Sequence, residues 1–195
     1  MTASTISNSW DRIESWLEAN APRTYASLPP GAEEETIHAA EAVLGQPFPA
    51  ELTQSLLRHD GSGYFDVIGV LQFLSVQAIV MDRKAATDLE RETQRGGDLR
   101  GLFLRDGYAL WHPSDLPFAS DSGGSLLILD TRAHETPSRV GRHDELGSTT
   151  FSPDDMWKSL NHLLDSVATA LKNSTPLGRY EATVVDGRLD WQLNV

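Results

Sequence analysis

One continuous apolar run limits what the middle of this chain can form. Leu126–Leu129 is apolar throughout and is closed by Asp130, a pattern typical of a short strand buried on both faces. The segment before it, Ser120–Ser125, is a turn-forming run with two glycines, and Pro117 breaks regular structure, so we expect a loop that leads into the strand. No Lys follows the glycine pair and no helix comes next, which excludes a phosphate-binding loop.

Further strands are expected on either side of this run. Arg139–Arg142 is predicted to be its antiparallel neighbour. The aromatic and β-branched residues of 64–68 and 70–74 predict two short strands around a turn at Gly69. The segment Arg100–His112 fits either a strand or an irregular loop.

The last part of the sequence carries a hairpin signal. Tyr180–Val185 and Arg188–Leu193 are alternating segments separated only by Asp186-Gly187. Asp-Gly in this place suits a type I′ turn, which joins two antiparallel strands directly.

Apolar residues at helical spacing predict five helices. Their first turns carry typical signals, such as the acidic run Glu33–Glu35, proline at Pro49, and serine caps at Ser75 and Ser152. The expected helices span 9–20, 33–44, 49–59, 76–92 and 153–172.

This order of elements predicts an α+β fold. We expect a central, mainly antiparallel sheet flanked by helices, with an added C-terminal β-hairpin, rather than a doubly wound sheet. The expected organisation is a disordered leader over 1–8, one domain over 9–175, and the hairpin over 176–195 appended to the same domain.

The balance of charge is unusual. The formal net charge is −12, from 28 acidic and 16 basic residues, and half of the excess lies in residues 1–60. An acidic surface repels phosphates, so direct nucleic-acid binding is not expected. The charge can steer a basic protein partner, or it can serve solubility alone.

The composition also indicates a compartment. There is no cysteine, which excludes disulfides, thiolate chemistry and cysteine-based zinc sites. No apolar run approaches the ~20 residues of a membrane span. Residues 1–9 lack the cationic start and apolar centre of a signal peptide. We expect a cytoplasmic protein that does not bind a membrane.

No familiar catalytic or metal-binding motif is present. The best metal candidate joins His134-Glu135 to His143-Asp144-Glu145, but polar loops produce such pairs by chance, so no metal and no cofactor are expected. His59-Asp60 could be a base with its orienting carboxylate, yet a cation at a helix end has a structural explanation.

Two looser sets also favour structural roles. Ser120, Ser122 or Ser125 can be combined with almost any histidine into a triad, and only geometry would identify one. Carboxylates that could hold a cation are better explained as turn-forming residues; these are Asp115, Asp121 and Asp130.

Several segments, in their order along the chain, resemble the SUKH superfamily, which includes the yeast cell-wall assembly regulator (the SMI-KNR type) and many bacterial immunity proteins. The resemblance covers about residues 9–172. The matching residues are Trp10, Ile13, Leu28–Ala32, Ile37, Ala40-Glu41, Leu44-Gly45, Phe48–Leu52, His59–Gly61, Leu116–Ala119, Asp121, Gly124, Leu129-Asp130 and Val140. The chain departs from the pattern at Ser125, where an acidic residue is usual, and at Met81-Asp82, where a Trp is common.

The resemblance implies an α+β domain that binds proteins and has no catalytic residues. Many bacterial members are immunity proteins that neutralise a polymorphic toxin, often a nuclease or a nucleic-acid deaminase, and such toxins tend to be basic. We therefore expect a non-enzymatic immunity protein. The alternatives are a regulatory scaffold of the cell-wall assembly regulator type and an enzyme that uses the scattered His and Asp residues.

The candidate contacts with a basic toxin domain follow from charge. Carboxylates complement such a partner, and the association should weaken as salt rises. The acidic residues that we single out are Glu33, Glu34, Glu35, Asp98, Asp106, Asp121 and Asp130.

Overall fold

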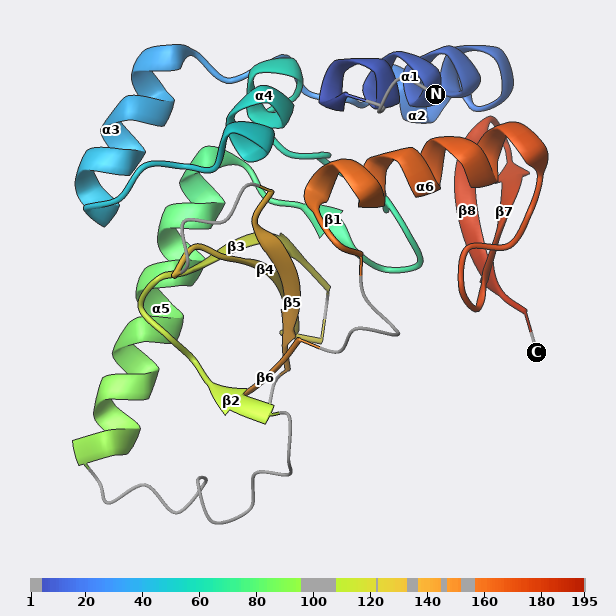
Figure 1. Cartoon of the computed structure of the whole chain (residues 1–195). Helices are drawn as coiled ribbons and strands as arrows, with labels where there is room; N and C mark the ends of the chain where they lie inside the picture. The colour runs from blue at the N-terminus through green and yellow to red at the C-terminus, as the bar shows by residue number, and fades with distance from the viewer. Residues whose placement is uncertain are drawn as a thin grey trace.

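The structure is a computed structural model and describes residues 5–95, 108–121, 123–132, 137–144, 147–151 and 157–194. Within these ranges, helices pack around a six-stranded antiparallel sheet, and a separate hairpin lies near the C-terminus (Figure 1). The helices are α1 (Ile6–Asn20), α2 (Pro22–Tyr25), α3 (Glu34–Leu44), α4 (Ala50–Arg58), α5 (Val76–Arg95) and α6 (Leu160–Asn173). The strands are β1 (Gln72–Phe73), β2 (Tyr108–Leu110), β3 (Asp115–Ser120), β4 (Leu126–Asp130), β5 (Arg139–His143), β6 (Ser148–Thr150), β7 (Tyr180–Val185) and β8 (Arg188–Leu193). The predicted α+β class is confirmed.

The strand β4 lies inside the sheet, whose order is β1-β3-β4-β5-β6-β2. All five of its residues are buried, because helices or neighbouring chain cover both faces. The register pairs Leu129 with Leu116 of β3 and with Val140 of β5. The predicted strands β4 and β5 are therefore confirmed. The segment 100–112, for which the sequence fits either a strand or a loop, contains the strand β2. The strand β6 was not predicted.

The part of the predicted loop around Pro117, up to Ser120, is in fact the strand β3, so the expectation was wrong there, whereas Asp121 and Gly123–Ser125 form the predicted turn before β4. Proline cannot donate to a ladder, so it is tolerated in a sheet only where pairing is irregular. Here the register with β4 shifts between Pro117 and Ala119, and β1 pairs only with Ala119 and Ser120. The bulge lets the chain keep a strand through Pro117.

The two strands predicted around Gly69 are also corrected. The turn exists, with Gly69 at a φ of 63°, but only an isolated bridge joins Ile68 to Leu71. The preceding residues form a loop, because the Ser62 hydroxyl accepts from the Phe73 amide (2.9 Å) and donates to the Phe65 carbonyl (2.7 Å). This side-chain bridge takes the place of a ladder, and only the two-residue β1 remains.

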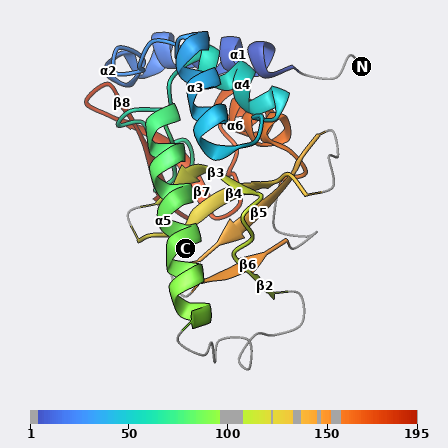
Figure 2. The same ribbon diagram turned by 90° about the vertical axis from the view of Figure 1, so that its left-hand side faces the viewer.

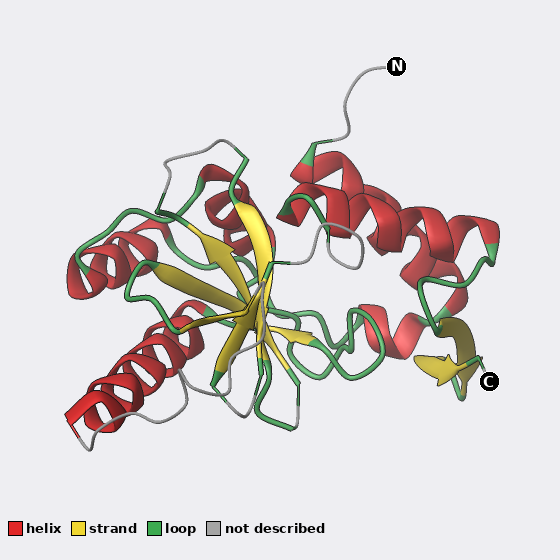
Figure 3. Cartoon of the chain, turned by 60° about the horizontal axis from the view of Figure 1, so that its bottom comes forward, coloured by secondary structure: helices red, strands yellow, loops and turns green. Residues whose placement is uncertain are grey.

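The helices form two groups around the sheet (Figures 1 and 3). The helices α1, α4 and α6 pack on one another, with Trp10, Ile13 and Leu164 fully buried between them. The helix α5 runs along the sheet beside β3, with α3 against it (Figure 2). No helix within the described ranges has both the length and the apolar character to cross a bilayer.

Two helices begin more than one residue away from the expected position. The helix α1 starts at Ile6, because the Thr5 hydroxyl caps it by accepting from the Asn8 amide (3.2 Å). Residues 6–8, expected to be disordered, are thus helical. The helix α6 begins after Ser159, whose hydroxyl accepts from the His162 amide (3.1 Å). The expected cap at Ser152 lies outside the described residues.

The C-terminal hairpin is confirmed, including its turn. Asp186 and Gly187 both have positive φ, at 50° and 73°, as a type I′ turn requires. The hairpin docks on α2, since the Arg23 amide donates to the Gly187 carbonyl and the Leu189 amide donates to the Thr24 hydroxyl, each at 2.9 Å. Hydrogen bonds therefore join the short helix α2 to the C-terminal hairpin.

Candidate functional site

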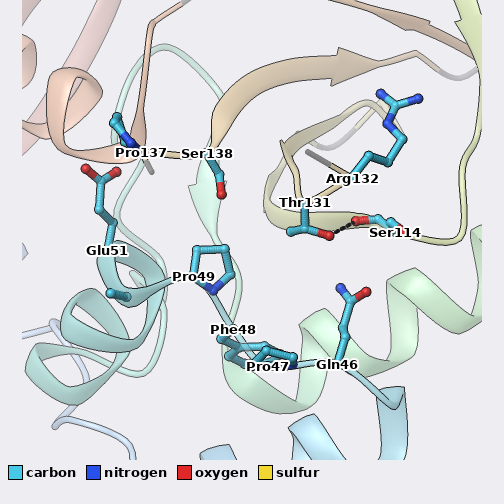
Figure 4. A pocket seen from close by; sticks show the side chains of 11 residues that line it. Gln46, Pro47, Phe48, Pro49, Glu51, Ser114, Thr131, Arg132, Pro137 and Ser138 are labelled. Carbon is cyan, nitrogen blue, oxygen red and sulfur yellow. Dashed lines mark hydrogen bonds between the residues drawn. The ribbon is translucent and has the colours of Figure 1, made fainter. Parts of the chain in front are cut away.

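A pocket of about 320 Å³ lies between the α3–α4 loop and one end of the sheet (Figure 4). One wall is the loop with the first turn of α4, from Gln46 to Glu51. The other wall comes from the residues next to β3, β4 and β5, namely Ser114, Thr131-Arg132 and Pro137-Ser138. The pocket thus lies where segments distant in sequence meet.

The loop wall is held in place by side chains that satisfy its backbone. Gly45 ends α3 in the left-handed conformation, and Glu41 Oε1 accepts from the Phe48 amide (2.7 Å). Arg83 of α5 donates to the Leu44 carbonyl and to Gln46 Oε1, both at 3.1 Å. These bonds fix the shape of the wall.

Arg83 also reaches the opposite side of the pocket. Its guanidinium donates to the carbonyl of Pro113, which precedes β3. Burial lowers the pKa of Arg83, and the nearby charge of Asp115 opposes that shift. Arg83 is therefore a clamp between α3, α5 and the sheet rather than a charge available to a ligand.

The sheet wall rests on an ion network at the ends of β3, β4 and β5. Arg132 donates from Nε to Asp130 Oδ1 (2.8 Å), and Arg139 donates from Nη2 to Asp130 Oδ2 (2.7 Å). Asp115 is opposite Asp130 in the sheet register, and its Oδ1 lies 3.8 Å from Arg132 Nη2. Arg139 also lies over the ring of Phe151, 4.1 Å from its centroid.

The two carboxyls of this network have opposite pKa shifts. Burial raises the pKa of Asp115 to about 6, although the His112 amide and Arg132 partly oppose the shift. Burial also acts to raise the pKa of Asp130, but hydrogen bonds from Arg132 and Arg139 outweigh it and hold the pKa at about 2. Asp130 is therefore stabilised as an anion, whereas the ionised form of Asp115 is destabilised.

The pocket offers recognition rather than an evident reaction. Its described lining contains three prolines and the hydroxyls of Ser114, Thr131 and Ser138, with no histidine beside them. The Thr131 hydroxyl donates to the Ser114 carbonyl (2.6 Å), so it is already bonded. Such a surface can receive a side chain of another molecule by shape and by a few hydrogen bonds.

A model of the SMI1/KNR4 family (SUKH-1) matches residues 31–166, which is well over half of the chain. This chain belongs to the SMI1/KNR4 family (SUKH-1). The predicted resemblance is thereby confirmed at the level of the family. A search of curated proteins found no match.

The family match covers both walls of the pocket but not the whole fold. It begins after α2 and ends within α6, so α1, α2 and the hairpin β7–β8 lie outside it. These outer elements pack onto the SUKH-1 region: Trp10 of α1 and Trp191 of β8 are buried in its core. The indole of Trp191 donates to the Asp66 carbonyl (2.9 Å).

The structure places the predicted contact residues in different settings. Glu33 precedes α3 and Glu34-Glu35 lie in its first turn, and all three are exposed. Asp121 and Asp130 instead have internal partners, since Asp121 Oδ1 accepts from the Gly123 and Ser125 amides. Asp98 and Asp106 lie outside the described residues. A contact role for these residues stays a prediction.

The turn-forming role predicted for the other aspartates agrees with the geometry. Asp115 Oδ2 accepts from the His112 amide (3.0 Å), and Asp130 Oδ1 accepts from the Arg132 amide (3.1 Å). Each carboxylate therefore orders its own stretch of backbone, as expected of aspartate in turns.

The candidate histidines have structural neighbours. His59 Nδ1 lies 2.6 Å from the Pro29 carbonyl and its Nε2 lies 3.0 Å from Glu14 Oε1, while Asp60 Oδ1 accepts from the Val76 amide at the start of α5. His143 contacts the Thr149 hydroxyl (2.9 Å). Within the described ranges, no three His, Asp or Glu side chains come together as metal ligands. His134, Glu135 and Glu145 lie outside those ranges.

Sequence reasoning missed the two sites that the fold assembles. The ion network at Asp130 requires the register of three strands, and a second cavity beside α5 requires the packing of that helix on the sheet. In the sequence, the ion network is indicated only by the placement of Asp130, Arg132 and Arg139 on either side of the predicted link between two antiparallel strands.

Proposed function

We propose that this chain is a non-enzymatic protein-binding module, an immunity protein that neutralises a basic toxin domain by covering it. The observation that carries the proposal is the balance of charge in a member of the SMI1/KNR4 family: the net charge is −12, the acidic run at the start of α3 is exposed, and several arginines are already paired with carboxylates of the chain.

The internal pairing of arginines supports this view. Arg58 bonds to Asp11 and Glu14, Arg12 bonds to Asp165, and Arg132 bonds to Asp130. Each such pair offsets one positive charge with one negative charge, so the excess of carboxylates over cations remains. With a net charge of −12, the exterior potential is negative.

The acidic run at the start of α3 adds a compact exposed charge. Glu33, Glu34 and Glu35 make no ion pair with the rest of the described chain. A toxin that acts on nucleic acid needs a basic cleft to hold the phosphates, and an acidic protein surface complements the same cleft. Binding there would exclude the nucleic acid and stop the reaction.

The test is a capture experiment with the tagged full chain and the products of the adjacent genes. We expect it to retain a basic toxin domain, to abolish that domain's nuclease or deaminase activity, and to lose it when salt rises from about 50 to about 500 mM. Capture that is indifferent to salt would contradict the electrostatic basis. Capture of a host regulatory protein instead would favour the regulatory scaffold.

A variant of the α3 run sharpens the same test. Replacing Glu33, Glu34 and Glu35 with Gln removes charge from exposed positions and leaves the fold intact. If the run contacts the toxin, association slows and the salt dependence becomes shallower. An unchanged association rate would place the contact elsewhere on the acidic surface.

A further inference from the structure

The pocket between the α3–α4 loop and the sheet holds a buried hydroxyl that the chain does not use. Ser138, which comes just before β5, lines the pocket and is only 8% exposed. Its hydroxyl makes no hydrogen bond with the described residues, and Figure 4 shows it pointing toward Pro49 on the opposite wall. A buried polar group without a partner costs free energy, so this hydroxyl is suited to a partner from outside the chain.

The opposite wall carries further unused donors at the start of α4. This nine-residue helix begins without a side-chain cap, and the Pro49 carbonyl accepts from the amides of Leu52 and Thr53, at 2.9 and 3.0 Å. The preceding amides, those of Ala50 and Glu51, have no acceptor in the described part of the chain. Both residues line the pocket. The pocket therefore has hydrogen-bond donors on both of its walls.

One acceptor stands among these donors. Glu51 Oε2 accepts from the Asn161 amide (3.2 Å), and Oε1 of the same carboxylate has no donor in the described ranges. Figure 4 shows this carboxylate rising from α4 toward Pro137. The pocket can thus accept one hydrogen bond as well as donate several.

The lining has no spare positive charge for an anion. Arg132 is the one cation among the described residues that line the pocket, and its Nε and Nη2 already donate to Asp130, at 2.8 and 3.0 Å. A bound carboxylate would therefore meet the negative charge of Glu51 without a new counter-charge. A lysine could pair with Glu51, but it would leave the free α4 amides without an acceptor. A neutral group that both accepts and donates satisfies the whole set.

We propose that this pocket binds a primary carboxamide, the side chain of an asparagine or glutamine that the protein partner inserts. Its carbonyl oxygen accepts from the Ser138 hydroxyl and the free α4 amides, and its NH2 group donates to Glu51 Oε1. The inference rests on the proposed function, because it takes the partner to be a protein, and it names the side chain by which that protein is recognised.

The walls suit the rest of such a side chain. Phe48 and the prolines of the pocket give an apolar surface for the methylene groups, and the volume of about 320 Å³ lies in the range typical of ligand sites. Arg83 holds the loop wall through the Leu44 carbonyl, and the Asp130 ion network holds the sheet wall. A preformed pocket of this kind spends little binding free energy on ordering itself.

Blocked amino acids test the pocket directly. The probe is N-acetyl-glutamine N-methylamide, titrated into the 15N-labelled full chain and followed by amide chemical shifts. We expect saturable shifts at Phe48, Glu51 and Ser138, with a Kd on the order of 1 mM. The blocked glutamate of the same shape should bind about tenfold more weakly or worse. Equal binding of the two probes, or no saturable binding of the glutamine probe, would overturn the proposal.

A serine pair supplies the matched variants. Ser138→Ala removes the buried hydroxyl and should weaken the glutamine probe by about threefold to tenfold. Ser7→Ala removes an exposed hydroxyl on α1, outside the pocket, and should leave the affinity within about 1.5-fold of the natural chain. Full affinity in Ser138→Ala would contradict the role of this hydroxyl as a donor.

Glu51→Gln separates recognition from support of the fold. The variant keeps an oxygen for the Asn161 amide and removes the charge, so the preference for the glutamine probe over the glutamate probe should fall to about threefold or less. A purely structural role would leave that preference unchanged. A preference that stays at about tenfold in a folded Glu51→Gln chain would therefore overturn the assignment of Glu51.

A blocking variant extends the test to the partner. Ala50 is exposed and lines the pocket, so Ala50→Tyr obstructs the pocket without changing a buried side chain. It should abolish saturable binding of the glutamine probe, with an unchanged circular dichroism spectrum. Free glutamine that binds more than about tenfold tighter than the blocked probe would identify a metabolite site and overturn the inserted side chain.

The captured toxin distinguishes this inference from the proposed function. If Ala50→Tyr releases a toxin that the natural chain retains, the partner occupies the pocket as proposed. If the toxin stays bound to Ala50→Tyr with full affinity, the pocket inference fails and the immunity function stands. If the glutamine probe binds in the pocket and no toxin is captured, the carboxamide site stands and the immunity function fails.

Discussion

The strands β3 and β4 have carboxylates at both of their ends, and the two ends differ in what balances them. At one end, Asp130 is held by Arg132 and Arg139, and Asp115 lies opposite it in the register. At the other end, Asp121 orders the β3–β4 turn through backbone amides, and Arg142 Nη2 lies 3.6 Å from its second oxygen.

This difference separates a carboxylate held by arginines from one held mainly by backbone amides. The arginine-paired end satisfies both oxygens of Asp130 with guanidinium groups within the chain. At the turn end, backbone amides satisfy one oxygen of Asp121, and Arg142 lies at a longer distance from the other. The charge of Asp130 therefore supports the sheet, whereas the oxygen of Asp121 orders a turn.

The largest expected effect concerns the arginine-paired end. Asp130→Asn leaves two guanidiniums beside a neutral amide, and should lower the free energy of unfolding by roughly 2 to 3 kcal/mol at pH 7. The folded-state pKa is depressed to about 2, so this stability is present above pH 4 and is lost as the pH falls through about 2. Urea unfolding of the natural chain and of Asp130→Asn at pH 7 and pH 3 measures the loss of stability and its dependence on pH. If the two chains differ more in stability at pH 3 than at pH 7, the ion network is contradicted.

The neighbouring carboxyl should behave in the opposite way. The pKa of Asp115 is raised to about 6, so the ionised folded form is disfavoured and the natural chain loses stability as the pH rises from about 4 to about 6. Asp115→Asn should therefore raise the free energy of unfolding by about 2 kcal/mol at pH 7, with little gain at pH 4. Thermal unfolding of both chains across this range tests the sign, and an equal gain at both values of pH would refute it.

At the β3–β4 turn, the effect should depend on an acceptor rather than on charge. Asp121→Ala removes the oxygen that accepts from Gly123 and Ser125, and should cost about 1.5 kcal/mol. Asp121→Asn keeps an acceptor in the same place and should cost less than about 0.5 kcal/mol. If both variants lose the same stability, the charge rather than the turn bonds is what matters there, and the two ends are alike.

The smallest effect on stability is expected at Asp82. It has no ion pair with the described residues, and burial raises the pKa of its carboxyl, so Asp82→Asn should leave the free energy of unfolding within about 0.5 kcal/mol of the natural chain or slightly above it. Chemical denaturation provides the measurement. A clear loss of stability would mean that the charge of Asp82 supports the fold.

The parts of the fold that sequence predicted are those with strong local signals. The run Leu126–Leu129 and the Asp186-Gly187 turn each determine their own structure, and both predictions are confirmed. The strand through Pro117 could not be predicted, because only the bulge against β4 makes proline tolerable there. The start of α6 after Ser159 was also not predicted, since the local signals at Ser152 and Pro153 favour an earlier start.

The candidate site was less predictable, for a related reason. Acidic charge is visible in the sequence, but whether a carboxylate meets an arginine is decided by register and packing. Asp115 and Asp130 are separated in sequence but opposite one another in the sheet, and Asp82 lines the same cavity as Asp121 and Asp144 because α5 lies along β3. Sequence alone therefore treated Asp121 and Asp130 alike, whereas the structure gives them different partners.

The hydrogen bonds between α2 and the C-terminal hairpin bear on how this chain evolved. Both elements lie outside the region matched by the SUKH-1 model, at opposite ends of the sequence, and each satisfies backbone groups of the other through Arg23, Thr24, Gly187 and Leu189. Neither extension is complete without the other, so selection should act on them as a pair. Relatives are expected to have gained both extensions or neither.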